Sequence, residues 1–428
     1  MKKNMCVLAA LVCLLLSPSL SLAEDIYVDP SFTGTSNGTE NAPWKDLVKQ
    51  VYSKSLKGGD RILLKPGYYG HLSIYKKNNE SEVQIISTVK HKAIFAKIDI
   101  RDSDYWTVDG VKVQLDKNTP EKARNLVDLE TGSAHVRFIN SYVSSSSNTE
   151  GWTPEEWNKK VKSGIFSRAD PVDISHNDIR VVNDAITAMK GAATVVGNSI
   201  SDFIGDGLRG LGSNSLYEGN IVKNCHKVSG NHLDGFQSWS MDGNWNVGVS
   251  VVKDVVLRGN IFIANETDQN SPKCDMQGIG MFDGMFENWV IENNIVVVDH
   301  WHGLSVYGAK NVKILNNTVF DPNRRKPGPA WIRLSNHKNG TKSQGNLVAN
   351  NLASSFQFPD GGVLQLQNQI IRNPYAIFAD PENQNYRLKE GARAIDAGME
   401  GVGPKVDFYG NPRPSGEKID VGAAEFQK

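Results

Sequence analysis

Two cations stand in the segment "AITAMKGAATVVGNSISDFIGDGLRG", residues 185–210, which is otherwise rich in small, apolar and turn-forming residues. Lys190 and Arg209 lie 19 residues apart. A lysine can act as a base when neighbouring positive charge lowers its pKa. An arginine can clamp a carboxylate with two parallel N–H donors and meet the charge that develops there. The pair therefore suits proton abstraction next to a carboxylate, provided that the fold brings the two side chains together.

The fold is indicated by an internal repeat of about 22 residues, anchored on asparagines at recurring intervals of 21, 22 and 23 residues. Between the anchors lie short segments of alternating polarity bounded by Gly and Asn, which are typical of β-strands. Such repeats bury their apolar faces only by stacking. The anchors are Asn177, Asn198, Asn220, Asn260, Asn294, Asn317 and Asn351. We predict an all-β, right-handed parallel β-helix with three strands per coil and an asparagine ladder.

The repeat also predicts which side chains face inward and which face the surface. The inward positions are Ile165, Ile186, Leu208, Phe236, Ile279 and Leu304. The same register equates Arg209 with Thr187, three positions before Lys190, so we expect the two cations on adjacent rungs but offset along the sheet. Outward polar and aromatic side chains would form a surface suited to a sugar polymer. The predicted substrate-binding residues are Arg168, Asp184, His232, Asp234, Gln237, Trp239, His302 and Tyr307.

Several of these residues have a simpler explanation. Aspartate is common in turns, which applies to Asp184, before Ala185, and Asp206, before Gly207. The side chains that packing or solvation alone can account for are Lys190, Trp239, His302 and Tyr307.

The N-terminal residues 1–23 have the features of a cleaved signal peptide, because Lys2 and Lys3 precede an apolar run that leads to Ala23. Cleavage leaves 45 basic and 47 acidic residues, so an anionic ligand must be held by local cations. No later stretch has the length and hydropathy of a membrane span. We expect a secreted or periplasmic monomer with no nucleic-acid partner.

Residues 24–428 are expected to form one solenoid domain, capped at both ends. The N-terminal cap, 24–60, is predicted to hold a helix that ends at Gly58-Gly59, and the tail from about 373 to 428 is predicted to cover the C-terminal end. The residues expected on the buried face of the capping helix are Trp44, Leu47, Val48 and Val51.

Three insertions, 144–163, 240–253 and 265–276, are expected as loops on this scaffold. The first is predicted to hold a short helix with Thr153 as its cap and Pro154 in its first position. Cys225 and Cys274 remain after signal cleavage and can pair in an oxidising compartment, although the sequence leaves their pairing open.

The coil pattern resembles the pectate-lyase-like β-helix superfamily over most of residues 25–370. Within it, "MKGAATVVGNSISDF" followed by "DGLRGLGSNSLYEGN" is similar to the segment of chondroitinase B and related alginate lyases that holds a lysine and, one coil later, an arginine. The resemblance implies cleavage of an acidic polysaccharide by β-elimination, with Lys190 as base and Arg209 as acid. Alginate is the expected substrate, ahead of pectate or a glycosaminoglycan.

The same resemblance implies a calcium site beside the lysine, although the sequence itself requires no cofactor. A clear cluster of calcium ligands is missing from the sequence. The column of Asp184, Asp206 and Asp234 is the substitute that it offers.

Three other functions fit parts of the sequence. "HGLSVYG" followed by "WIRLS" resembles polygalacturonase signatures, and Asp206 and Asp234 would then be the acid and base of a glycoside hydrolase. A C5-epimerase would begin with the same proton abstraction as a lyase. The third alternative is a non-catalytic carbohydrate-binding β-helix, which would not explain why Lys190 and Arg209 occur as a pair. The other side chains that can take the proton are His232, His302 and Tyr307.

Overall fold

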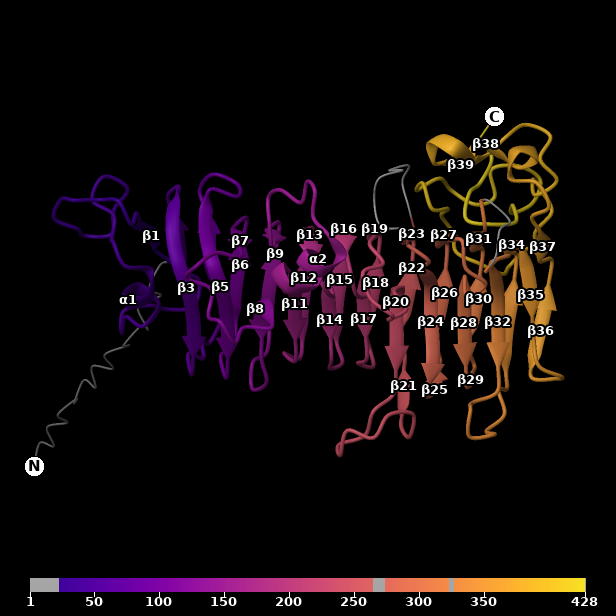
Figure 1. The fold of residues 1–428 in the computed structure, drawn as a ribbon, viewed down its shortest axis with the longest axis horizontal. Coiled ribbons are helices and arrows are strands. Elements are labelled where there is room, and N and C mark those ends of the chain that lie inside the picture. The colour runs from indigo at the N-terminus through magenta and orange to yellow at the C-terminus, as the bar shows by residue number, and fades with distance from the viewer. Residues whose placement is uncertain (1–22, 265–273, 323–326, 428) are drawn as a thin grey trace, which may run out of the picture.

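The computed structural model describes residues 23–264, 274–322 and 327–427. The predicted signal peptide, apart from Ala23, and residues 265–273 of the third insertion lie outside these ranges. Figure 1 shows one elongated stack of strands that runs from the N-terminal end to the C-terminal end. In the described ranges, no helix has the length and hydropathy needed to cross a membrane.

Each coil contributes three strands, as predicted, and the strands of successive coils pair in parallel. The first ladder is a 13-stranded sheet. Its strands are β1 (Asp25–Val28), β2 (Arg61–Leu64), β4 (Val83–Ser87), β6 (Trp106–Asp109), β9 (Val136–Ile139), β12 (Val172–Ser175), β15 (Ala193–Val196), β18 (Leu216–Glu218), β22 (Val256–Arg258), β26 (Val290–Glu292), β30 (Lys313–Leu315), β33 (Asn346–Ala349) and β36 (Val363–Leu366).

The second and third ladders belong to one 21-stranded sheet, joined through β3 (Gly67–Tyr75) and β5 (Ala93–Arg101). The second ladder continues through β7 (Lys112–Gln114), β10 (Tyr142–Ser144), β13 (Asp178–Val182), β16 (Ser199–Phe203), β19 (Ile221–Cys225), β23 (Ile261–Ile263), β27 (Ile295–Val297), β31 (Thr318–Phe320), β34 (Leu352–Ala353) and β37 (Gln369–Ile370). The third continues through β8 (Asn125–Leu129), β11 (Ser163–Ser167), β14 (Ile186–Ala188), β17 (Leu208–Gly210), β20 (Asp234–Trp239), β24 (Gln277–Asp283), β28 (Leu304–Tyr307), β32 (Trp331–Ser335) and β35 (Ser355–Gln357).

The asparagine ladder is confirmed and fixes the register of the coils. The side-chain amide of Asn177 donates to Asn198 Oδ1 at 3.0 Å, and that of Asn198 donates to Asn220 Oδ1 at 2.9 Å. The same bond recurs through Asn260, Asn294, Asn317 and Asn351 and ends on Asn368. Each amide also donates to a backbone carbonyl of the preceding coil, so these buried polar groups are satisfied.

The predicted inward residues are confirmed as core. All six are buried at 0 or 1% exposure and stack along the third ladder. Arg209 pairs with Thr187 on one side and Gln237 on the other, as the repeat predicts. The repeat also predicts one outward column that holds Leu211, Trp239 and Phe282, and the structure differs from it at two points. Leu211 is buried, and an irregularity after Ser238 sets Trp239 opposite Asp283 instead of Phe282.

The N-terminal cap differs from the predicted helix. Helix α1 (Leu47–Val51) is five residues long and ends well before Gly58. Leu47 and Val51 are buried, but Val48 is 41% exposed. Trp44 precedes the helix and bridges to Val28 of β1. A single helical turn cannot carry the four-residue face that the sequence suggested, since Trp44 packs from extended chain.

The first insertion folds as predicted and docks on the side of the stack. Helix α2 (Pro154–Lys160) begins with a capping box between Thr153 and Glu156. Trp157 of this helix stacks on His226 with ring centroids 4.4 Å apart, and His226 pairs with Asp202. The helix is therefore fixed against the turns that follow β16 and β19.

Three shorter strands extend the coils beyond the third ladder: β21 (Val251–Lys253), β25 (Met285–Glu287) and β29 (Ala309–Lys310). Cys225 and Cys274 form a disulfide, with their Cα atoms 5.5 Å apart, which settles the pairing that the sequence left open.

The C-terminal segment leaves the coil pattern after β37. It contains the 3-10 turns η1 (Pro374–Ala376) and η2 (Pro381–Asn383) and the antiparallel strands β38 (Phe378–Asp380) and β39 (Asn385–Leu388). Phe378, Tyr386 and Val421 pack with Ile295 and Phe320 of the second ladder in a separate apolar cluster. Figure 1 shows this segment folded over one side of the last coils.

Candidate functional site

The guanidinium of Arg209 is fixed by two aspartates at the centre of the third ladder. Its Nε donates to Asp206 Oδ2 at 2.6 Å, and its Nη1 donates to Asp184 Oδ2 at 2.7 Å. The side chain keeps 27% exposure, whereas Asp206 keeps 3%. Burial lowers the pKa of Arg209, but the charges of Asp206 and Asp184 outweigh burial and raise this pKa above its ordinary value. Arg209 is therefore an oriented cation with Nη donors left for a ligand.

The aspartates form a ladder of their own, because they hold equivalent positions in successive coils, Asp184 before Ala185, Asp206 before Gly207 and Asp234 before Gly235. The Asp184 Oδ1 accepts the backbone N–H of Asp206 at 3.0 Å, and the Asp206 Oδ1 accepts that of Asp234 at 2.9 Å. The pattern ends at the next coil, where Gln277 N–H donates to the Leu233 carbonyl. The Asp234 Oδ1 is left without a hydrogen-bond donor in the described part of the chain.

His232 covers the last aspartate of this ladder. Its Nδ1 lies 3.7 Å from Asp234 Oδ2, which also accepts a hydrogen bond from Gln237 Nε2 at 3.1 Å. Burial raises the pKa of Asp234 to about 7, and the contact with Asp234 raises the pKa of His232. The His232 imidazole, at 66% exposure, therefore lies beside a buried carboxyl group, and the protonation of the two groups is linked.

The side chains of Asp184, Asp206, Arg209, His232 and Gln237 line one pocket of about 380 Å³, formed by residues of three successive coils. Asp234 contacts His232 and Gln237, but its own side chain is fully buried. Arg209 is the fixed cation of this pocket, and the two carboxylates that accept its N–H groups hold it in place. The arrangement can bind a carboxylate and move a proton beside it.

Lys190 lies apart from this arrangement. It is exposed in the turn after β14 and is not among the described residues that line the pocket. The confirmed pairing of Thr187 with Arg209 puts Lys190 three residues, ~10 Å, further along the strand direction. The guanidinium turns the other way, toward Asp206. The structure therefore does not bring the two predicted catalytic cations together, and the role of Lys190 as base stays a prediction.

Arg168 and Trp239 border the Lys190 side of the groove. The guanidinium of Arg168 lies 5.5 Å from the ring centre of Trp245 and within 3.6 Å of Glu130. Trp245 belongs to the second insertion, which leaves β20 and reaches back over two coils to β11. The Trp239 ring lies 5.8 Å from the Arg209 guanidinium. The sequence predicted Arg168 and Trp239 but missed Trp245, because the residues of a loop do not indicate which part of the surface the loop folds back onto.

His302 and Tyr307 lie in a second cluster, three coils or ~14 Å from Arg209 along the third ladder. His302 Nδ1 lies 2.9 Å from Ser305 Oγ, and burial lowers the pKa of His302 to about 4, so its ring is neutral. The Arg333 guanidinium lies 5.1 Å from the Tyr307 ring centre. The other rings of this cluster are Phe282, His300, Trp301 and Trp331. This aromatic surface, with the Arg333 guanidinium beside it, suits a sugar ring distant from Arg209.

The aspartate ladder does not fit the calcium that the resemblance implied. The oxygens of Asp184 and Asp206 already accept backbone N–H groups or face Arg209, and the side chain of Asp234 is fully buried. Within the described ranges, no group of three or more His, Cys, Asp or Glu side chains is placed to share a metal ion. We therefore derive no step that uses calcium.

The raised pKa of Asp234 predicts a pH-dependent stability. Between about pH 4 and pH 7 an unfolded chain has lost this proton while the folded chain keeps it, so the free energy of unfolding falls as pH rises. Asp234→Asn removes this loss. We expect its melting temperature, relative to that of the unsubstituted protein, to rise between about pH 5 and about pH 8. Asp360→Asn, an exposed control, should show a constant difference; the same constant difference for Asp234→Asn would contradict the assignment.

Comparison with known proteins supports the fold. A family model described as "Right handed beta helix region" matches residues 163–319. Pectate lyase Pel9A aligns over 96% of this chain and 98% of its own, at 16% identity and a TM-score of 0.51. A mannuronic acid specific polysaccharide family 6 lyase from human gut microbiota aligns over 75% and 83%, at 14% identity and a TM-score of 0.44. No curated protein matches the chain in sequence.

The chain is therefore a right-handed parallel β-helix, as predicted, and its fold is similar to that of pectate lyase Pel9A. A likeness at this level of identity extends to the fold alone, so the activity has to be argued from the site.

Proposed function

We propose that the protein is an exported polysaccharide lyase that cleaves a uronate polymer, with alginate as the first candidate. The observation that carries the proposal is Arg209, a guanidinium fixed by Asp184 and Asp206 and open to a pocket of about 380 Å³. A uronate carboxylate bound there accepts the remaining Nη donors. Binding offsets its charge, which makes the adjacent C5 proton easier to remove.

The elimination then needs a proton acceptor beside the bound carboxylate. In the reaction the base takes the C5 proton, the C4–C5 double bond forms, and the bond from C4 to the glycosidic oxygen breaks, with a proton going to the departing oxygen. His232 lines the same pocket as Arg209, and its Nδ1 lies 3.7 Å from Asp234 Oδ2. We assign proton transfer to His232 in preference to Lys190, because a base must reach the same sugar that Arg209 holds.

The hydrolase alternative fits the pocket less well. A glycosidase needs two carboxyl groups that touch the sugar or a water molecule. The side chains of Asp206 and Asp234 keep 3% and 0% exposure, and Asp206 is occupied by Arg209 and a backbone N–H. Both aspartates are therefore positioning residues, which hold Arg209 and His232.

The proposal is tested by incubating the purified protein with alginate, pectate, a glycosaminoglycan and a neutral glucan. We expect new reducing ends and, in parallel, the ultraviolet absorbance of unsaturated uronate, on at least one acidic polymer. Reducing ends without absorbance would favour hydrolysis and overturn the proposal. Neither signal would favour a binding protein, and exchange of the C5 proton with solvent without cleavage would indicate an epimerase.

A further inference from the structure

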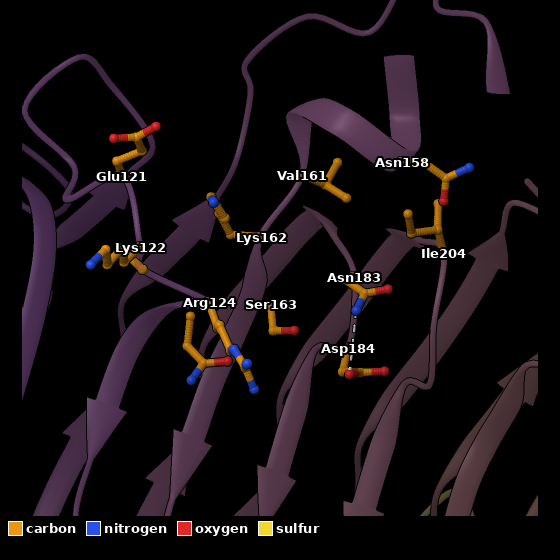
Figure 2. A pocket seen from close by; sticks show the side chains of 12 residues that line it. Glu121, Lys122, Arg124, Asn158, Val161, Lys162, Ser163, Asn183, Asp184 and Ile204 are labelled. Atoms are coloured by element: carbon orange, nitrogen blue, oxygen red, sulfur yellow. Dashed lines mark hydrogen bonds between the residues drawn. The ribbon is translucent and has the colours of Figure 1, made fainter. Parts of the chain in front are cut away.

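A second pocket, of about 530 Å³, opens next to the one that holds Arg209. Helix α2 contributes Asn158 and is followed by Val161 on one side of it, and Figure 2 shows Arg124, Ser163 and Asp184 on the other. The two pockets share Asn183 and Asp184, so a single elongated ligand can occupy both. The reaction proposed above leaves this second pocket without a role.

Three cations line the pocket: Lys122, Arg124 and Lys162. Throughout the described ranges, no carboxylate lies within ion-pair distance of any of the three. Glu121 is the one lining carboxylate besides Asp184, whose charge Arg209 already meets. The pocket therefore carries an excess of positive charge in a chain with 47 basic and 47 acidic residues.

The position of these cations relative to Arg209 follows from strand pairing. Asn125, next to Arg124, pairs with Ser163, and β11 pairs with β14, which precedes the coil of Arg209. Arg124 is thus three coils, ~14 Å, from Arg209 along the helix axis. Because a pyranose is about as long as the ~4.8 Å coil spacing, a polymer lying along the groove puts a sugar two or three units away at Arg124.

We infer that Lys122, Arg124 and Lys162 form a binding subsite for the carboxylate of a second uronate, two or three sugars from the one held by Arg209. Arg124 offers a planar fork for the carboxylate, and Ser163 and Asn183 offer hydrogen bonds to hydroxyls. This inference rests on the proposed function for its choice of a uronate polymer. It makes the protein selective for chains that carry acidic sugars at both positions.

The test is a triple variant, Lys122→Gln, Arg124→Gln and Lys162→Gln, with calorimetric binding of an unsulfated oligouronate disaccharide, too short to span both positions, and a hexasaccharide. Both the variant and its parent carry His232→Ala to prevent turnover. We expect the hexasaccharide to bind at least about tenfold more weakly to the triple variant, and the disaccharide to bind equally to both. The matched control is Lys45→Gln, Lys54→Gln and Lys90→Gln, three exposed lysines away from the pocket, which should bind like the parent.

Unchanged hexasaccharide binding, or an equal loss in the control variant, would overturn the subsite. Tighter charge-dependent binding of a sulfated galactan would overturn its assignment to a uronate. Because binding is measured without turnover, a protein that binds the hexasaccharide through these cations but makes no unsaturated product would retain the subsite and lose the lyase. If the protein makes unsaturated product but the triple variant binds the hexasaccharide as tightly as its parent, the lyase would be retained and the subsite lost.

Discussion

Arg209→Ala should lower the rate of uronate elimination by about 100- to 1,000-fold, the usual cost of removing one fixed donor from a developing oxyanion. The reason is that Arg209 is the cation whose free Nη groups face the pocket, so its loss leaves the bound carboxylate beside Asp184 and Asp206. Initial rates measured by ultraviolet absorbance on the preferred polymer would give the loss. An Arg209→Ala protein that folds and cleaves at the original rate would contradict the assignment.

The control for Arg209 separates charge from geometry. Arg209→Lys keeps a cation between the two aspartates but loses the planar fork, so we expect a stability near that of the unsubstituted protein with most of the rate loss retained. Carboxyl-reduced polymer supplies a second control. It has no charge for Arg209 to meet, so any residual cleavage of it should be insensitive to Arg209→Lys.

His232→Ala should lower the elimination rate by about 100- to 10,000-fold, whereas Lys190→Ala should change it by less than about tenfold. His232 shares a pocket with Arg209 and lies 3.7 Å from Asp234, while Lys190 lies ~10 Å further along the strand direction. Both side chains are exposed, so neither change should unfold the protein. Lys90→Ala is the matched control for loss of an exposed lysine.

The pH dependence of kcat/KM distinguishes a base from a histidine that only supports the structure, because only the pKa of a base would set this dependence. Asp234 raises the pKa of His232, so Asp234→Asn should shift the rising limb of kcat/KM toward lower pH. Loss of activity in Lys190→Ala with full activity in His232→Ala would contradict this account and restore the lysine as base.

Much of the fold could be predicted from the sequence, because the same residue types recur at equivalent positions in every coil of a stacked repeat. Each ladder asparagine must donate to the next, and each residue after the coil-opening glycine must be buried, so period and chemistry agree at every turn. The register of Thr187 with Arg209 followed directly. The capping helix was predicted less well, since a single sequence window lacks that repetition.

The candidate site was only partly predictable, because side-chain direction is not periodic. The register put Lys190 three positions beyond Arg209, but only the structure shows the guanidinium turned toward Asp206. Aspartates that looked like turn residues prove to be a hydrogen-bonded ladder beneath the cations. Trp245 and Lys122 belong to loops, and the paths of these loops depend on tertiary packing.

The most direct test of the central claim is the mass of the products formed in heavy-oxygen water. Elimination breaks the C4–oxygen bond without adding water, so we predict unsaturated oligouronates that are lighter by one water than hydrolysis products and carry no heavy oxygen from solvent at the cleavage point. The same digestion by Arg209→Lys should yield the same products more slowly. Saturated products that contain solvent oxygen would contradict a lyase and assign the groove to a hydrolase.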